Sequence, residues 1–521
     1  MRASKLTGGR LCCFLIALGA CGDGGGGAPP AVTAPLAGAS GGTAAGASGG
    51  AAGAAGQQST AGSGGSAGGA EQAAGAGGAA AAGAGGAGGA GGSIAPAQAD
   101  PDSWPQMGYD ERSRYHNPAE TRITKANAAT LKLKWTFTVS GFPPGSPAIA
   151  EGKVFVLATG GLYAIDLEKG TELWKRMDIT GTASVAYHDG SVYVHAGNAD
   201  LYRVKASDGT NVWGPVRTYD NAQADGMSSP IVAGKLVMVG HSAEAAEIDS
   251  AGALEADRKA ARGGVFAADV ETGQMAWRYY TVPGAPGENG AMVWSSVAVD
   301  VGAGMVYATT GNNWDVGGPN SDAFHAVSLM SGTGMWKKQV RAGDVWALMV
   351  PGGGQDTDFG ANPIIAEKDG RKMVAAGDKG SVFWALDPMT GEILWKRENL
   401  SASHNPATGG VLNNGAFDGN AFYVVANETP AGSHLHALDP MTGADVWPAK
   451  TYMETAWGMP TVANGVLFVP INATLYVLDA ATGAQLTMFD TGGTIAAGGA
   501  AVAKGHVVVG SGLQYVSRSA R

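Results

Sequence analysis

The stretch VFWALDPMTGEILW (Val382–Trp395) decides the fold of this chain. Residues 382–387 show the alternation of a β-strand. The segment Pro388–Gly391 supplies a turn, in which Gly391 is free to take positive φ, and residues 392–395 begin a second strand that ends on an indole. One such hairpin cannot bury its apolar face alone, so it requires neighbours of the same kind.

The same unit recurs along the chain, which makes seven copies in all. The other six are LYAIDLEKGTELW, ending at Trp174; LYRVKASDGTNVW, at Trp213; VFAADVETGQMAW, at Trp277; FHAVSLMSGTGMW, at Trp336; LHALDPMTGADVW, at Trp447; and LYVLDAATGAQLT, at Thr487. We expect each Trp to pack between neighbouring repeats.

The two ends of the globular region complement each other. The strand Leu131–Val139 contains a Trp like that of every fourth strand but has no three strands before it. Near the other end, Ala500–Val502, His506–Gly510 and Leu513–Ser517 are three short strands without a closing Trp strand. We therefore predict an eighth blade, shared by residues 131–140 and 495–521, which closes the ring and removes exposed sheet edges.

The fold expected is all-β: an eight-bladed β-propeller of four-stranded antiparallel blades, the last closed by N- and C-terminal strands. The other blades are centred on residues 145–178, 182–219, 227–281, 291–340, 358–399, 411–451 and 457–490. Three insertions, His241–Arg262, Asn313–Asp322 and Arg341–Phe359, break the even spacing. Since insertions in repeat proteins gather on one functional face, we look for chemistry there.

The first twenty residues have the pattern of a secretory signal peptide. Three basic residues precede the apolar run Leu11–Leu18, which is too short to span a membrane comfortably. The sequence Leu18–Cys21 resembles a bacterial lipobox, which implies that Cys21 becomes the lipidated first residue; the alternative is ordinary cleavage with Cys21 incidental. Cys12, Cys13 and Cys21 are the three cysteines of the chain, so we expect no disulfide or thiolate metal site in the folded part.

Residues 21–99 form a Gly/Ala/Ser-rich linker, which we expect to be a disordered tether between the signal peptide (1–20) and the propeller (100–521). Removal of residues 1–20 changes the net formal charge from −10 to −13. No basic stripe is visible, so we expect no nucleic-acid partner. No second apolar run is long enough to span a bilayer, so membrane contact is expected through the lipid anchor only.

The A-x-D-x-x-T-G-x-x-x-W unit resembles the repeat of the pyrroloquinoline quinone (PQQ) propeller superfamily, over essentially all of residues 103–521. The segments GAMVWSSVAVDVGAGMVYATTGNN (Gly290–Asn313) and DTDFGANPII (Asp356–Ile365), with WPQMGYDERSRYHNP near the start, look like polyvinyl-alcohol dehydrogenases and related quinoprotein alcohol dehydrogenases. That superfamily also contains non-catalytic scaffolds.

The resemblance implies a set of site residues for PQQ and Ca²⁺. Metal ligands would be Glu244, with Glu247 as a rival, Asn312 in a T-G-N motif, and Asp358, which has Asp356 beside it and would also be the catalytic base. Trp294 would stack on the quinone and Lys379 would contact it. A hard cation prefers oxygen ligands and polarises the carbonyl that accepts hydride.

Each residue also has a purely structural interpretation. Glu244 lies in an acidic, Ala-rich insertion and could be solvated, Asn312 could belong to a turn, and Asp358 could cap one. Trp294 could pack between blades and Lys379 could lie in an ordinary hairpin turn. The order in which the five occur along the chain favours the functional interpretation.

The chain also departs from the pattern of these enzymes. The propeller has no cysteine for the adjacent-cysteine disulfide, and no C-x-x-C-H, so no haem of its own is expected. The first blade begins GFPPGSPAIA, without the expected Glu, and no arginine lies near residues 182–184. Electrons would have to pass to a separate cytochrome or other acceptor.

Two functions follow as hypotheses. The first is a lipid-anchored PQQ- and Ca²⁺-dependent alcohol dehydrogenase in the bacterial cell envelope, at the outer membrane, the periplasmic face or the cell surface. The second is a non-catalytic scaffold lipoprotein similar to that of the outer-membrane β-barrel assembly machinery. The metal triad and the two segments that resemble dehydrogenases discriminate between them, because a scaffold has no reason to carry them.

Overall fold

The computed structural model describes residues 100–142, 145–248, 252–284, 287–346, 354–402, 409–428, 432–512 and 514–519. The predicted signal peptide, Cys21 and the linker to residue 99 lie outside these ranges. In the ranges described, no helix has both the length and the apolar character needed to cross a membrane.

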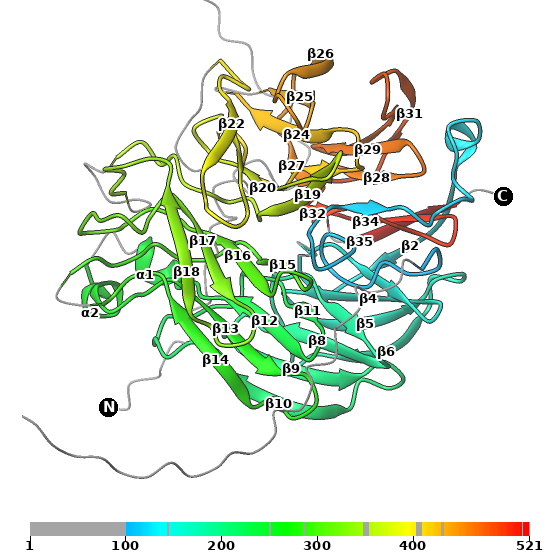
Figure 1. Cartoon of the computed structure of the whole chain (residues 1–521). Coiled ribbons are helices and arrows are strands. Elements are labelled where there is room, and N and C mark those ends of the chain that lie inside the picture. Colours follow the sequence, from blue (N-terminus) through cyan, green and yellow to red (C-terminus); the bar gives the residue numbers. More distant parts are fainter. Residues whose placement is uncertain are drawn as a thin grey trace, which may run out of the picture. The chain divides into compact units, whose positions relative to one another are not determined.

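Eight four-stranded antiparallel sheets, the blades, form a β-propeller (Figure 1). Blade 1 contains β3 (Ala148–Ala150), β4 (Lys153–Ala158), β5 (Gly161–Asp166) and β6 (Glu172–Arg176); blade 2 contains β7 (Ala186–His188), β8 (Ser191–His195), β9 (Asp200–Lys205) and β10 (Asn211–Arg217). Blade 3 contains β11 (Ile231–Ala233), β12 (Leu236–Gly240), β13 (Gly264–Asp269) and β14 (Met275–Tyr280); blade 4 contains β15 (Ala298–Asp300), β16 (Met305–Thr309), β17 (Ala323–Ser328) and β18 (Gly334–Gln339).

The remaining blades complete the ring. Blade 5 contains β19 (Ile364–Lys368), β20 (Arg371–Gly377), β21 (Phe383–Leu386) and β22 (Ile393–Arg397); blade 6 contains β23 (Ala416–Phe417), β24 (Phe422–Asn427), β25 (Ser433–Leu438) and β26 (Asp445–Tyr452). Blade 7 contains β28 (Thr461–Ala463), β29 (Val466–Ile471), β30 (Thr474–Asp479) and β31 (Gln485–Asp490). Blade 8 contains β33 (Ala501–Ala503), β34 (His506–Ser511), β35 (Gln514–Ser519) and β2 (Lys132–Thr138).

Blade 8 confirms the predicted closure by both ends of the chain. Strand β2 pairs antiparallel with β35, with Lys132 opposite Ser519 and Thr138 opposite Gln514. In Figure 1 the blue start of the propeller lies beside its red end. A further short parallel pair, β27 (Trp457–Met459) with β32 (Ala496–Gly499), joins blades 7 and 8.

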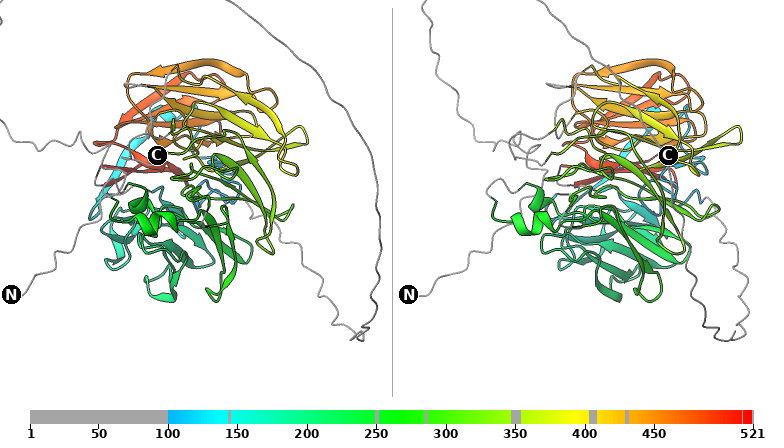
Figure 2. Two further views of the ribbon diagram at one scale, coloured as in Figure 1. Left: turned by 90° about the vertical axis from the view of Figure 1, so that its left-hand side faces the viewer. Right: turned by 60° about the vertical axis from the view of Figure 1, so that its left-hand side comes forward.

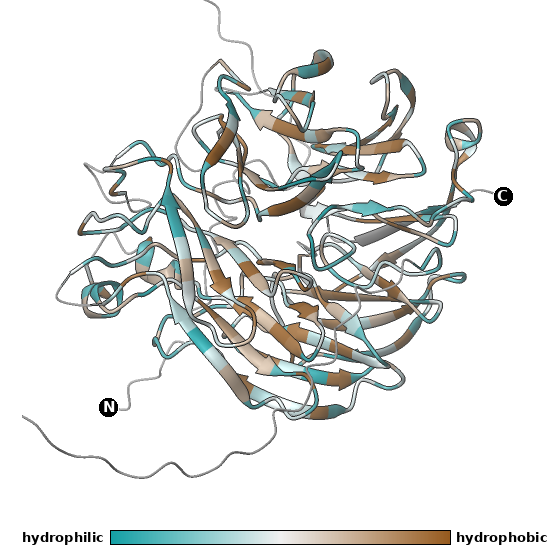
Figure 3. Ribbon diagram, viewed as in Figure 1, coloured by the Kyte–Doolittle hydropathy of each residue, from teal (hydrophilic) through white to brown (hydrophobic). Residues whose placement is uncertain are grey.

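Burial follows the position of a strand in its blade. The inner and second strands are covered on both faces, so β3, β4 and β12 are buried almost throughout, whereas the outer strands β6 and β18 are partly or largely exposed. Figure 3 shows the same gradient, with brown inner strands and paler or teal outer ones. The core therefore lies between blades and not within any one of them.

Each Trp of the repeat docks on the next blade, as predicted. The indole N–H of Trp336, for example, donates to Pro388 O at 3.0 Å, and Gly391 of the next turn lies against its ring with φ of +73°. The equivalent indole donors and acceptors are Trp135 with Leu167, Trp174 with Ala206, Trp213 with Val270, Trp277 with Leu329, Trp395 with Pro440, and Trp447 with Ala480. Where the last repeat has Thr487 instead, Arg518 of blade 8 stacks over Phe489 of blade 7.

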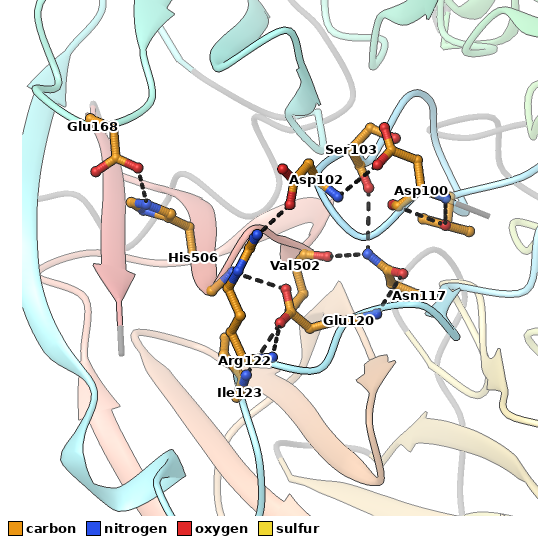
Figure 4. Close-up of polar contacts among 12 residues, drawn as sticks. Asp100, Asp102, Ser103, Asn117, Glu120, Arg122, Ile123, Glu168, Val502 and His506 are labelled. Carbon is orange, nitrogen blue, oxygen red and sulfur yellow. Dashed lines mark hydrogen bonds and ion pairs between the residues drawn. The ribbon is translucent and has the colours of Figure 1, made fainter. Parts of the chain in front are cut away.

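The segment before β2 is not an irregular lead-in but a strap that touches every blade. In this N-terminal strap (residues 104–117), Trp104 exchanges two backbone hydrogen bonds with Ile149 of blade 1, and β1 (His116–Asn117) pairs parallel with β28 of blade 7. Between them the strap accepts backbone N–H bonds from blades 2 to 6, at Tyr187, Val232, Val299, Ile365 and Phe417. Asn117 Nδ2 donates to Val502 O of blade 8 at 2.9 Å, and Glu120 accepts the N–H of Gly505 (Figure 4).

A polar ring runs through the residues that lie two positions before each inner strand. The backbone N–H of one such residue donates to the side chain of the next, in the order Ser146, Ser184, Ser229, Ser296, Asn362, Asn414. The N–H of Gly499, which lies two positions before β33 of blade 8, donates to Ser146 Oγ at 2.7 Å and extends the series by one blade. These hydrogen bonds hold the starts of neighbouring inner strands at the same height along the axis of the propeller.

The three insertions lie side by side, as predicted. Isolated bridges join Arg262 to Gly290, Gly290 to Asn313, and Asn313 to Val345. The first insertion also folds into two one-turn helices that the sequence did not predict, α1 (Glu244–Glu247) and α2 (Glu255–Lys259), which stand outside the sheets (Figure 2). A short 3₁₀ turn, Ala128–Thr130, precedes β2.

We expect Ser296→Ala to destabilise the propeller by about 1–3 kcal/mol, because the buried N–H of Ser229 loses its acceptor. The midpoint of urea unfolding measures the effect. Ser207→Ala, at an exposed turn position, is the matched control and should leave the midpoint unchanged. Equal effects of the two substitutions would contradict a stabilising role of the polar ring.

Candidate active site

The predicted site residues occupy equivalent ends of the blades. Trp294 and Asp358 lie just before inner strands β15 and β19, and Asn312 and Lys379 lie just after second strands β16 and β20. Because inner and second strands run antiparallel, these positions fall at one end of the ring. Glu244 follows β12 in the same way, at the start of α1.

Lys379 is the centre of the cluster. Its Nζ lies 2.8 Å from Asp356 Oδ1 and 2.8 Å from Asp358 Oδ1, and only 8% of its side chain is exposed. Burial alone would lower the pKa of Lys379, but the two carboxylates raise it above its ordinary value, so the ammonium stays charged. The backbone N–H of Lys379 also donates to Asp358 O at 2.9 Å. Lys379 is therefore not an exposed turn residue.

Trp294 forms one wall of this cluster. Lys379 Nζ lies 5.4 Å from the centre of its ring, and its indole N–H donates to Asp358 Oδ2 at 3.4 Å. It thus differs from the repeat tryptophans, which donate to the turn of the next blade. A Cβ on Gly311 would lie 2.9 Å from Asp358 Oδ2, and one on Gly360 would lie 2.5 Å from the Trp294 ring. Both positions require glycine for the backbone to approach the site closely.

Asp344 positions the acidic segment. Its Oδ2 accepts the N–H of Thr357 at 2.6 Å and the Thr357 hydroxyl at 2.7 Å. This holds the stretch between Asp356 and Asp358 in place, so both carboxylates point at Lys379. Burial raises the pKa of Asp358 above its ordinary value, while Lys379 opposes the shift.

Asn312 joins the cluster through a tryptophan. Its Nδ2 donates to Trp346 O at 2.7 Å, and the Trp346 ring lies 5.9 Å from Lys379 Nζ. Asn312 is 2% exposed, so it is not a solvated turn residue. The bond to Trp346 uses the amide nitrogen and leaves the oxygen as the ligand atom that could face a cation.

Glu244 lies at the start of α1, whereas Lys379 forms its ion pairs with Asp356 and Asp358. Glu244 is buried, at 8% exposure, and its backbone N–H donates to Asp225 Oδ2 at 2.7 Å. Glu247, one turn later, interacts electrostatically with Lys379, Asp358 and Asp356, and desolvation raises its pKa well above the ordinary value. Glu247 therefore lies close enough to Lys379 for the two charges to interact.

Asp322 is an acidic residue of this region that the sequence did not single out as functional. It is fully buried at the end of the second insertion, and neither carboxylate oxygen has a hydrogen-bond partner among the residues described. Burial raises its pKa to about 9, with the charges of Asp358 and Asp344 adding to the shift. Its backbone lies in the left-handed region, with φ of +49°, and its N–H donates to Gly311 O.

The structure thus brings together Trp294, Asp358 and Lys379 in direct contact, attaches Asn312 to them through Trp346, and leaves Glu244 on a neighbouring helix. In the described part of the chain no group of three or more His, Cys, Asp or Glu side chains is arranged to hold a metal ion. The predicted ligand set contains two carboxylates and an amide. Sequence reasoning gave no role to Trp346, Asp344 and Asp322; their only signal was their position in two of the three insertions.

A family model described as outer membrane protein assembly factor BamB, PQQ_2, matches residues 119–340 and 431–518, which is more than half of the chain. The chain belongs to the PQQ_2 family. This agrees with the repeat, the Trp docking and the eight blades described above, and it confirms the resemblance to the PQQ propeller superfamily.

Relatives with named activities are dehydrogenases. A polyvinylalcohol dehydrogenase from Pseudomonas sp is 27% identical over 390 residues, which is 67% of this chain and 59% of the relative. The PQQ_2 chain thus spans about three fifths of the length of that relative.

Solved structures establish the fold. The crystal structure of the quinohemoprotein alcohol dehydrogenase from Comamonas testosteroni has a TM-score of 0.67 at 20% identity, with 81% of this chain and 82% of that chain covered. BamB from Moraxella catarrhalis has a TM-score of 0.52 at 14% identity, with 75% and 100% covered.

We expect Asp322→Asn to stabilise the protein at pH 8 by about 1–3 kcal/mol, and to have little effect at pH 4. The folded pKa of about 9 exceeds the ordinary aspartate pKa of 3.8, so the folded state binds a proton that the unfolded state has lost, and stability falls as the pH rises between these values. An asparagine carries no charge and removes this dependence.

Thermal unfolding across this pH range measures the effect. Asp369→Asn is the matched control, because Asp369 has the same left-handed backbone, with φ of +50°, but is exposed. A variant at position 322 that unfolds at a lower temperature than the wild type at pH 8 would show that the carboxylate is satisfied in the folded protein.

Proposed function

We propose that this PQQ_2 propeller is a PQQ- and Ca²⁺-dependent alcohol dehydrogenase similar to polyvinylalcohol dehydrogenase. The observation that carries the proposal is the buried cluster in which Lys379 bridges Asp356 and Asp358 beside Trp294. Sequence similarity to a polyvinylalcohol dehydrogenase over two thirds of the chain supports it.

The residues present suit a planar anionic quinone and a cation. The Trp294 ring lies beside Lys379. Gly311 and Gly360 have no side chain to fill the space next to that ring. Asp358 Oδ1 accepts no hydrogen bond of good geometry despite its ion pair, and both oxygens of Asp322 are unpartnered within the part of the chain described. A buried excess of carboxylates over ammonium groups favours a bound cation.

Bound PQQ with Ca²⁺ would supply the acceptor for the hydride that leaves the alcohol carbon. Asp358 would accept the hydroxyl proton as that hydride leaves, which gives the aldehyde or ketone. Lys379 keeps Asp358 in position and would offer its ammonium to the bound quinone. Glu244 or Glu247, Asn312 and Asp358 would supply oxygen ligands to the cation.

Electrons would then pass to an external cytochrome or other acceptor, because no C-x-x-C-H haem motif occurs in the sequence. The curated relatives named quinohemoprotein alcohol dehydrogenases are longer chains, of which this chain spans about half. The alcohol substrate would enter at the end of the ring where the three insertions meet.

Calorimetric titration of PQQ into residues 100–521 with Ca²⁺ tests the proposal. We expect micromolar or tighter binding that requires Ca²⁺ and weakens at least tenfold in Asp358→Ala and Glu244→Ala. Alcohol-dependent reduction of a dye acceptor should follow the same pattern. Glu392→Ala, an exposed carboxylate of blade 5, is the control and should bind like the wild type.

Absence of PQQ binding at every Ca²⁺ concentration would overturn the enzyme proposal. The second candidate, a non-catalytic scaffold, would then be favoured, since the family model is described as BamB and a BamB structure shares the fold. Recovery of envelope proteins with the purified propeller would be the positive result for that candidate.

We also propose that the propeller is anchored in the bacterial cell envelope through a lipid on Cys21. In a bacterial host the wild type should incorporate labelled palmitate and fractionate with membranes, and Cys21→Ala should do neither. Cys13→Ala, within the predicted signal peptide, is the control and should retain both. Incorporation of labelled palmitate into the Cys21→Ala protein would disprove a lipid anchor on Cys21.

A further inference from the structure

A hollow lies at the opposite end of the inner strands from the candidate active site. It is lined by the N-terminal strap and by the turns that follow inner strands, at Glu151–Gly152 of blade 1 and His188–Asp189 of blade 2. Trp294 and Asp358 precede their inner strands, so the two places lie at different ends of the propeller. The hollow has a volume of about 610 Å³, which is in the range of small-molecule sites.

Carboxylates dominate this hollow. Six line it, against one lysine, Lys504, and one histidine, His188; they are Asp100, Asp102, Asp110, Glu111, Glu151 and Asp189. Three of them already form ion pairs: Asp102 with Arg122 (Figure 4), Asp110 with Arg114, and Glu151 with Lys153. The other three, Asp100, Glu111 and Asp189, form no ion pair with any residue that the structure describes, so carboxylates outnumber cations in this hollow.

Glu111 is the unusual member of the set. It is 6% exposed and still lines the hollow. Its carbonyl accepts the N–H of Val299 at 2.7 Å, which fixes the strap beside blade 4. Its carboxylate accepts a hydrogen bond from its own backbone N–H, and within the described ranges it forms no ion pair. A carboxylate buried in this way is costly unless a ligand pairs with it.

The charge of Glu111 is correspondingly unfavourable in the free protein. Desolvation and the neighbouring Asp110 raise the pKa of Glu111, while the hydrogen bond from its own backbone N–H and the charges of Arg112 and Arg114 oppose the shift. A positively charged ligand at this point would offset the cost of burial.

The hollow suits an organic cation better than a bare metal ion. No three of its carboxylates belong to a group arranged to hold a metal among the described residues. Tyr109 and Tyr187 contribute aromatic rings to the wall, and Tyr187 Oη donates to Glu151 Oε1 at 2.7 Å. An ammonium or guanidinium group can pair with a carboxylate while its carbon chain lies against such rings.

We propose that this hollow is a binding site for a small organic cation, an amine or a guanidine, with Glu111 as its buried anionic partner. The site is separate from the proposed dehydrogenase centre and does not depend on it. The strap and the turns of blades 1 and 2 supply its walls, so the site exists only when the strap lies across the blades.

Calorimetric titration of the full chain with butylammonium and butylguanidinium tests the proposal, with neutral butyramide as the comparison ligand. Both cations should bind at least tenfold more tightly than butyramide, and Glu111→Gln should weaken them at least tenfold. Glu392→Gln and Asp358→Asn should leave binding unchanged, the second because the amine does not bind at the other acidic cluster. A blocked lysine amide distinguishes two sources of the cation. If it binds as tightly as butylammonium, the site accepts a lysine side chain of a protein; if it binds much more weakly, the site accepts a free amine.

A crystal soaked in 4-bromobenzylammonium gives a second measurement that does not require a variant. The anomalous signal of bromine should lie in the hollow, with the ammonium within hydrogen-bond distance of Glu111. Unchanged affinity in Glu111→Gln, binding of butyramide as tight as that of the cations, or bromine located only beside Asp358 would each overturn the proposal.

Discussion

The contact on which the rest of the propeller depends is the docking of each outer-strand tryptophan on the turn of the next blade. The indole N–H donates to a carbonyl of that turn, and the turn glycine lies flat against the ring, as for Trp336 with Pro388 and Gly391. Truncation of a buried Trp costs about 3–5 kcal/mol in other proteins. Seven such contacts join blades whose own faces could not be buried in isolation, so the repeat and the ring stabilise each other.

Closure of the ring then fixes the positions of the loops that carry the candidate site residues. The polar ring and the N-terminal strap hold the inner strands at one level and tie each to the same short segment. At one end of these strands lie the loops that carry Trp294, Asp358 and Lys379, and at the other lies the strap with Glu111. Loops held on such a rigid frame can position charged groups without being tightly packed themselves.

Both ends of the inner strands carry buried carboxylates, but they differ in how the charge is balanced. Beside Trp294 a buried ammonium bridges two carboxylates, and Asp322 stays protonated at neutral pH because its pKa is near 9. Beside the strap, Glu111 has no such partner. The first arrangement suits a site that handles a proton and an anionic cofactor, and the second suits a site that binds a cation.

The sequence by itself determined the blades. The turn that ends in Thr-Gly and the Trp that follows it recur along the chain, and each Trp contacts only the next blade, so the repeat can be recognised locally. It also predicted the composite eighth blade, because the three strands near the C-terminal end of the propeller lack a fourth strand, and the single strand near its N-terminal end supplies it. It named Trp294, Asn312, Asp358 and Lys379 only through a family resemblance. What only the tertiary structure decided was which charges meet: Lys379 pairs with Asp356 as well as Asp358, Glu247 interacts with it electrostatically, and Glu111 forms no ion pair in the described part of the chain. Asp356 and Asp358 precede β19 and Lys379 follows β20 of the same blade, while Glu247 follows β12 of blade 3, and no local period in the chain encodes the distances between these side chains.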